Sequence, residues 1–246
     1  MDSQEDVPQF IVFTADDAVQ SYTLDAVKQF LAHRQNPNGC PPVMTYYTSL
    51  SYTNYTLVTD WYVAGNEIAD HTYVPLPSPF GFPRRWGGRR SRFGTAPDAQ
   101  VPQRNPRSCA QPPPTHGFYR MTHVGPPTIE EINGNLIALN ALAGIPLTAI
   151  KGFRAPYLNF TADTLKLLYK SEFTYDSSAS ASIPVTEEYT DAFWPYTLDN
   201  GLANNCLSAP GVCKGEPKLP GFWEIPMYAF FDNRGVTGPH LMDPWL

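Results

Sequence analysis

Short apolar segments alternate with helix-like segments along most of this 246-residue chain, and this alternation limits the fold more than any other feature. The apolar runs predict buried strands over 9–14, 43–47, 67–70, 148–153, 173–175 and 222–231. The periodic segments predict helices over 22–33, 54–64, 128–143 and 161–170. Strands that alternate with helices favour a parallel sheet, so we expect an α/β fold built as a sheet or a barrel.

Polar residues follow several of these strands directly. Asp16 and Asp17 come after the first strand, His71 after the third and Arg154 after the fourth. In a parallel β/α barrel such residues gather on one face, where active sites are built. Two adjacent carboxylates need solvent, a metal or cationic partners, because unpaired burial costs several kcal/mol. An exposed turn or the first turn of a helix is an alternative interpretation of the acidic pair.

Residues 73–120 interrupt this pattern. The segment of 48 residues holds 10 of the 26 prolines and 8 of the 11 arginines, and it carries a net charge of +7 in a chain of −6. Its composition cannot bury enough apolar surface to order itself. Three interpretations remain: a mis-spliced or wrongly translated stretch, a genuine disordered insertion, and an RNA- or polyanion-binding segment. We favour the first, and expect residues 1–246 to form a single domain around the interruption.

Removing the interruption brings two histidines into register. If Thr72 is joined to Met121, His71 and His123 stand at i and i+4, so one helical turn presents both rings to one ion. A strand-end aspartate would complete a site of two histidines and one carboxylate, with positions open for water and substrate. In the chain as it stands the two histidines are 52 positions apart, which is no metal-ligand spacing.

Several motifs occur in an order typical of one family. They are Thr14–Asp17, the rejoined His71-Thr-Met-Thr-His123, Arg154–Tyr157, Phe173–Ser178 and Trp194–Tyr196, together with Asn36–Cys40 and Tyr52–Tyr55. In this order they resemble the motifs of the polysaccharide deacetylases, carbohydrate esterase family four, and in particular the chitin deacetylase-like branch. The resemblance covers nearly all of 8–72 and 121–245. It implies a distorted parallel β/α barrel, here incomplete at the C-terminal end.

The resemblance also implies a metal centre. Asp17, His71 and His123 would bind a divalent ion, usually zinc and sometimes cobalt. Asp16 would act as the general base that takes a proton from the attacking water. The activity expected of the family is removal of N-acetyl groups from chitin or a related N-acetylglucosamine polymer.

Three further residues have roles implied by the resemblance. Arg154 would hold Asp16 ionised, as a nearby cation should, and the backbone N–H of Tyr157 would stabilise the oxyanion. Trp194 would form a wall of the acetyl pocket. Each has a purely structural alternative: a surface ion pair for Arg154, a core ring for Tyr157 and a buried structural indole for Trp194.

The general acid of the family is a histidine near the C-terminus, and this residue has no good match here. His240 is the only late histidine, and its surroundings differ from the family motif. The alternative prediction is therefore a catalytically inactive, glycan-binding relative or a fragment. A small-molecule amidase on the same fold is a third possibility.

Composition and short motifs restrict partners and location. The acidic net charge gives no reason to expect nucleic acid, and no apolar stretch is long enough to span a membrane. Residues 1–9 lack the features of a secretory signal, whereas the family is expected to be secreted or bound to the cell wall. Asn54 and Asn159 are glycosylation acceptors in a secreted chain. Cys206 and Cys213 either close a small disulfide loop or stay as free thiols.

Overall fold

The computed structural model describes residues 11–72, 125–181, 193–204, 209, 211–212 and 215–229. The chain divides into two compact units, and all of these residues belong to the first. The second unit, 75–123, lies outside the described residues. The predicted insertion over 73–120 lies outside them too, as do Cys206 and Cys213. The prediction of a single domain therefore stays a prediction.

Within the described residues, seven strands form one sheet in the order β1-β2-β3-β4-β5-β8-β7. Their bounds are β1 (Thr14–Asp17), β2 (Thr45–Thr48), β3 (Glu67–Asp70), β4 (Gly152–Phe153), β5 (Tyr175–Asp176), β7 (Tyr196–Leu198) and β8 (Leu219–Glu224). Neighbours from β1 to β8 pair in parallel, and β7 pairs antiparallel with β8. A separate parallel pair joins β6 (Ser180–Ala181) to β9 (Met227–Tyr228). The chain order of β1 to β5 is that of a β/α barrel wall, which confirms the predicted mostly parallel α/β fold.

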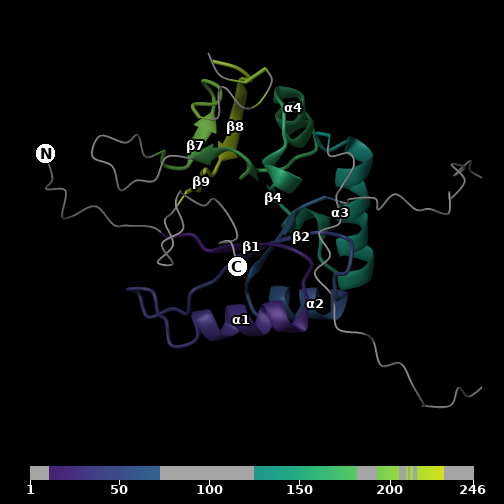
Figure 1. Cartoon of the computed structure of the whole chain (residues 1–246), viewed down its shortest axis with the longest axis vertical. Helices are drawn as coiled ribbons and strands as arrows, with labels where there is room; N and C mark the ends of the chain where they lie inside the picture. Colours follow the sequence, from purple (N-terminus) through teal and green to yellow (C-terminus); the bar gives the residue numbers. More distant parts are fainter. Residues whose placement is uncertain are drawn as a thin grey trace, which may run out of the picture. The chain divides into compact units, whose positions relative to one another are not determined.

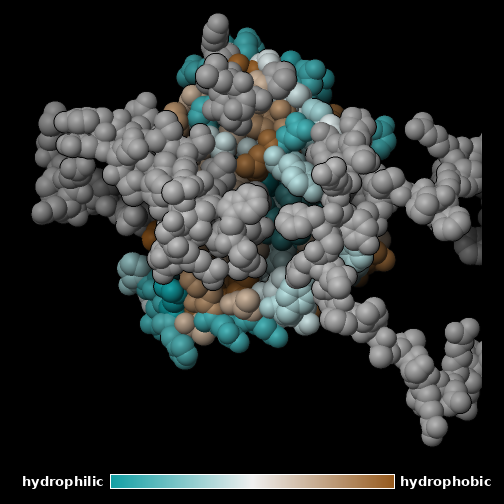
Figure 2. All heavy atoms as spheres, in the orientation of Figure 1, coloured by the Kyte–Doolittle hydropathy of each residue, from teal (hydrophilic) through white to brown (hydrophobic). Residues whose placement is uncertain are grey.

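Within the described ranges, four α-helices connect or flank these strands (Figure 1). They are α1 (Ser21–Leu31), α2 (Tyr55–Val63), α3 (Ile129–Ala143) and α4 (Ala162–Lys170), and two short 3-10 turns cover Leu147–Ala149 and Pro156–Leu158. The outward face of α1 is hydrophilic (Figure 2), and Leu24 is its buried residue. No helix in the described part of the chain is long and apolar enough to cross a membrane.

The helix ends follow from local sequence signals. The Thr128 hydroxyl accepts the Glu131 N–H at 3.3 Å, and the Glu131 carboxylate accepts the Thr128 N–H at 2.7 Å. This capping box was predicted from the sequence, and Gly144, at a φ of 69°, ends the same helix. Asn54 caps α2, because its side chain accepts the N–H groups of Thr56 and Leu57.

The two faces of β2 show how the sheet separates the core from the polar interior. All four residues of the strand are buried, and neighbouring side chains point to opposite faces. Tyr46 points to the helices and meets Trp61 of α2 edge to face, with ring centroids 6.3 Å apart. Tyr47 points the other way and stacks under the guanidinium of Arg154, 3.9 Å from the ring centroid.

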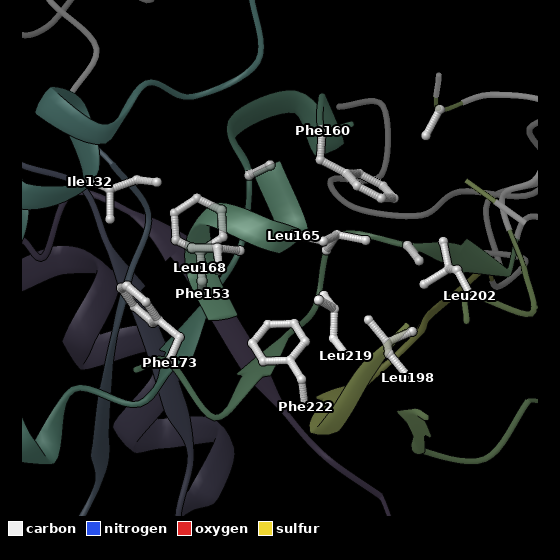
Figure 3. Packing of buried hydrophobic residues seen from close by; sticks show 13 residues of the cluster. Ile132, Phe153, Phe160, Leu165, Leu168, Phe173, Leu198, Leu202, Leu219 and Phe222 are labelled. Carbon is white, nitrogen blue, oxygen red and sulfur yellow. The ribbon is translucent and has the colours of Figure 1, made fainter. Parts of the chain in front are cut away.

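Two apolar clusters fill the space between sheet and helices. One lies under α1, α2 and α3 and includes Leu24, Val58 and Leu139. The other packs α4 against β4, β7 and β8, with Phe153 and Phe173 in edge contact at 5.8 Å (Figure 3). Each fully buried side chain of this size contributes about 1.5–3 kcal/mol, so these clusters hold the strand ends in place.

Several predicted strands are wrong in their bounds. The last, expected over 222–231, is divided between β8 and β9, which belong to different sheets. The first was expected as a buried run over 9–14, but β1 begins at Thr14, and Ile11 and Val12 are 66% and 61% exposed. Because β1 pairs only with β2, at the edge of the sheet, the apolar run before it has no neighbouring strand. The strand expected over 148–153 is reduced to β4, because a 3-10 turn follows Pro146. The segment 177–221, read as irregular, contains β6, β7 and the start of β8.

The close contact between Gly152 and Tyr175 gives a test of the fold. A Cβ at Gly152 would stand 2.1 Å from the ring of Tyr175, whereas a Cβ at Gly134, within α3, meets nothing within 4 Å. Gly152→Ala should lower the free energy of unfolding by roughly 1–3 kcal/mol. Gly134→Ala should raise it by about 0.5–1 kcal/mol through helix propensity. Urea denaturation measures both, and equal effects at the two positions would contradict the packing described.

Candidate functional site

Backbone strain is concentrated at the C-terminal edge of the parallel strands. Five non-glycine residues there have a positive φ, between 54° and 74°: Asp17, Tyr52, Thr72, Tyr157 and Leu158. Each follows or ends one of β1 to β4. A left-handed backbone at such residues costs on the order of 1–3 kcal/mol each, and clusters of them are typical of functional sites. This edge is also where the sequence placed the candidate residues.

Arg154 and Asp16 form a buried ion pair at this edge. The guanidinium Nη1 lies 2.7 Å from Oδ1 of Asp16, and the two side chains are 3% and 8% exposed. The second carboxylate oxygen, Oδ2, is buried and has no hydrogen-bond partner in the described structure. The arginine therefore fixes one oxygen of Asp16 and leaves the other able to accept a proton.

Three more residues hold the arginine itself. Nε donates to the carbonyl of Ser177 at 2.9 Å, Nη2 to its hydroxyl at 2.7 Å and Nη1 to the hydroxyl of Thr14 at 2.9 Å. The Tyr47 ring stacks on its face, and burial raises the pKa of Tyr47 to about 12, so this ring stays neutral. These hydrogen bonds and the ring contact together hold the guanidinium in one orientation.

His71 faces Asp17 across a short gap. The carbonyl of Arg154 lies 2.8 Å from Nδ1 of His71, so we assign the Nδ1 proton to that hydrogen bond. The lone pair of Nε2 then points toward Oδ1 of Asp17, which is 3.5 Å away. The imidazole is 5% exposed and the Asp17 side chain 82% exposed. Solvent can therefore reach the gap from the aspartate side.

The electrostatics of this pair call for a cation between the two groups. Burial alone lowers the pKa of His71, but the contact with Asp17 and the charges of Asp16 and Asp17 outweigh it and raise the pKa. The contact with His71 in turn lowers the pKa of Asp17, against the effect of burial. A proton serves as that cation when no metal is present, and a divalent ion would satisfy both ligand atoms more fully.

The residues present fit a metal such as zinc. Zn–N and Zn–O bonds of about 2.0–2.1 Å in a tetrahedral site place two ligand atoms roughly 3.4 Å apart, close to the observed 3.5 Å. The bond from Nδ1 to a carbonyl is the usual support of a metal-binding histidine. Within the described ranges no cluster of three or more histidine, cysteine, aspartate or glutamate residues forms an ion site. The predicted third ligand, His123, lies outside these ranges.

The turn that carries His71 is supported from behind. Oδ1 of Asp70 accepts the N–H of Thr72 at 2.7 Å and the side-chain amide of Asn135 at 2.6 Å. Asp70 is fully buried, and burial raises its pKa to about 7. The carboxyl group faces the helix layer, so it stands behind the site rather than in it.

A second buried acidic pair lies behind Ser177. Asp176 accepts both the N–H and the hydroxyl of Ser178, at 3.0 and 2.7 Å, and Glu224 accepts the N–H of Ala179 at 3.1 Å. Burial raises the pKa of Asp176 to about 6 and that of Glu224 well above its usual range. A protonated Glu224 beside an ionised Asp176 is the state that their mutual repulsion favours.

The two other predicted site residues that the structure describes lie in exposed positions. Tyr157 is 63% exposed in the turn after β4, and Trp194 is 59% exposed ahead of β7. Their predicted roles in oxyanion and substrate binding stay predictions. The sequence also missed Thr14, Tyr47, Ser177 and Asn135 as parts of the site. Thr14 stands in the Thr14–Asp17 motif and Ser177 in the Phe173–Ser178 motif, and these motifs were the signals that pointed to them.

Comparison with known proteins agrees with this architecture. No family model matches the chain. Chitin deacetylase 8 of Bombyx mori is 28% identical over 228 residues, which are 92% of this chain and 48% of that protein. Chitin deacetylase 1 of the same species is 26% identical over 224 residues, or 90% of this chain and 33% of that protein. The chain thus spans about half the length of the first relative and a third of the second.

The fold and these matches together define the class. The chain is an α/β protein whose mostly parallel sheet carries its candidate site at the C-terminal strand ends. The two matches extend over about nine-tenths of its length and confirm the resemblance seen in its motifs. It resembles the chitin deacetylases, and through them the polysaccharide deacetylases.

The acidic pair behind Ser177 predicts an unusual pH dependence. Because its pKa is raised from 3.8 to about 6, Asp176 holds its proton more tightly in the folded than in the unfolded chain. Stability from this group is present at acid pH and falls as pH rises through about 6. From this group alone we expect the metal-free chain to lose on the order of 3 kcal/mol between about pH 4 and 6, and the buried Asp70, whose pKa is about 7, adds to the loss up to about pH 7.

Urea denaturation in a chelator measures this loss. Glu224→Gln cannot ionise, so it removes the further loss that comes from the raised pKa of Glu224 at higher pH, and its total loss should be smaller. Asp163→Asn, at an exposed surface ion pair, should keep the wild-type profile. A stability that rises with pH in the wild-type chain would show that the acidic pair is wrongly described.

Proposed function

We propose that the chain is a metal-dependent hydrolase that removes N-acetyl groups from chitin or a related N-acetylglucosamine polymer. One observation carries the proposal: two adjacent carboxylates are treated differently by their surroundings. Asp16 is held by a buried arginine, whereas Asp17 is exposed and faces an imidazole lone pair. This is the division of work that one base and one metal ligand require. The relatives, both named as chitin deacetylases, support the choice of substrate.

The proposed ligands are Asp17, His71 and His123, with zinc as the expected ion and cobalt as a substitute. When bound, such an ion lowers the pKa of water towards 7 and polarises a carbonyl group. The first two ligands are among the described residues, and the His71 tautomer leaves Nε2 available. His123 completes the set in the proposal on the strength of the motif alone.

Asp16 is the proposed general base. Its Oδ1 is occupied by Arg154, so Oδ2 is the oxygen left to take a proton from the attacking water. Arg154 pairs its positive charge with this carboxylate and holds it in place for a base to act. Holding the carboxylate in one orientation also removes rotational freedom that would otherwise be lost in the transition state.

Two residues would contact the substrate. The backbone N–H of Tyr157 is proposed to donate to the oxyanion as the amide is attacked. The support is its place in the turn directly after Arg154, in a strained left-handed conformation. Trp194 is the proposed apolar contact for the acetyl group, supported by its exposed ring and by its motif.

Zinc binding and acetate release from chitin oligomers test the proposal. Asp17→Asn should lose zinc because it loses a charged ligand. Asp16→Asn should keep zinc but release acetate roughly 10²–10⁴-fold more slowly, since general-base catalysis contributes about that much. Asp163→Asn changes an exposed carboxylate of the same type in α4 and should match the wild-type chain.

Each possible failure has its own meaning. A wild-type chain that binds zinc and oligomers but releases no acetate would favour the inactive, glycan-binding alternative. A wild-type chain that binds no zinc would reject the metal site. Loss of zinc in Asp16→Asn would mean that the roles of the two carboxylates are wrongly divided.

A further inference from the structure

We propose that Asn135 is a positioning residue that fixes the turn carrying His71 in its ion-binding geometry. Asn135 belongs to α3, far in sequence from both β2 and β3, and it has no place among the motifs of the chain. The inference rests on the proposed metal site, because it concerns the orientation of one of the proposed ligands.

A single side-chain amide joins three elements. Asn135 is fully buried, and its Nδ2 donates to the carbonyl of Thr48 and to Oδ1 of Asp70, both at 2.6 Å. Thr48 ends β2 and Asp70 ends β3. The amide therefore ties α3 to the C-terminal ends of two neighbouring strands.

Both acceptors of this amide also control the backbone around His71. The carbonyl of Thr48 accepts the N–H of His71 at 3.2 Å. Oδ1 of Asp70 accepts the N–H of Thr72 at 2.7 Å, which closes a turn with His71 at its centre. Without Asn135 both acceptors would lose their second donor, and the turn would lose its attachment to the helix.

The cluster of Asn135 and Asp70 lowers the stability of the fold, and close packing alone does not explain why it is present. Oδ1 of Asn135 and Oδ2 of Asp70 are buried, and neither has a hydrogen-bond partner in the described structure. An apolar side chain at 135 would leave fewer buried polar atoms unpaired and would serve a purely structural contact better. A buried polar group kept at such a cost is expected where orientation matters.

The position of α3 gives Asn135 a further role. The helix begins at Ile129, after the interruption, and its amide reaches back 65 residues to Asp70 and 87 residues to Thr48. Asn135, which follows the interruption, thus supports the turn of His71, which precedes it. Docking of α3 and orientation of His71 are parts of one arrangement.

The test compares two asparagines of the same helix. Asn140 also donates its side-chain amide to a backbone carbonyl, that of Ile145 at 2.9 Å, but it lies away from the site. Asn135→Ala should weaken zinc binding by roughly 10- to 100-fold, the range seen when the support of a metal ligand is removed. Asn140→Ala should leave the zinc affinity unchanged. Competition with a chromophoric chelator measures the affinity, and thermal denaturation checks that both variants fold.

A second readout needs no metal. The Nδ1 proton of His71 is buried in its bond to Arg154 and should give a slowly exchanging NMR signal in the metal-free protein. This signal should be lost or exchange faster in Asn135→Ala and persist in Asn140→Ala. If Asn135→Ala does not fold, Asn135→Ser keeps a short donor and allows the same comparison.

The outcomes separate this inference from the proposed function. A folded Asn135 variant with wild-type zinc affinity and an unchanged His71 signal would overturn the positioning role. A wild-type chain without zinc affinity would reject the metal site instead, and the NMR comparison would still decide whether Asn135 positions the imidazole.

Discussion

A buried arginine connects the two halves of the candidate site. The side chain of Arg154 binds Asp16, and its backbone carbonyl binds Nδ1 of His71. One residue thus sets both the orientation of the proposed base and the tautomer of the proposed ligand. A buried charge is stable only with full pairing, and here Thr14, Ser177 and the face of Tyr47 complete it. The arrangement of the other groups at the sheet edge depends on this cation.

Several buried polar side-chain atoms at the site lack hydrogen-bond partners, which lowers the stability of the fold. Five buried side-chain polar atoms of the described structure lack a hydrogen bond, and four belong to Asp16, Asp70, Asn135 and Glu224. All four lie at or behind the C-terminal strand ends, where five strained backbone positions also gather. Proteins keep strain and unpaired polarity chiefly where function needs a fixed geometry. The destabilising features and the candidate functional residues therefore lie at the same edge of the sheet.

Local signals predicted the elements that depend on local chemistry. The strand Glu67–Asp70 and the capping box of α3 were placed as the structure has them, because each depends on neighbouring residues. The bounds of β1 were wrong, since an apolar run forms a strand only beside another strand. Asn135 and Tyr47 were missed for a related reason. Their contacts with Asp70 and Arg154 span 65 and 107 positions of sequence, and no periodic pattern encodes such pairs.

The interruption at 73–120 separates two strands that are neighbours in the sheet. Asp70 of β3 pairs with Phe153 of β4, and the N–H of Arg154 donates to the carbonyl of Asp70 at 3.0 Å. The closure entropy of a loop grows only with the logarithm of its length, by about 0.6 kcal/mol for each doubling. A pairing supported by the sheet, by α3 and by the arginine is worth more than that. The juxtaposition of Asp16, His71 and Arg154 therefore depends on what stands at the strand ends, and only weakly on how much chain lies between them.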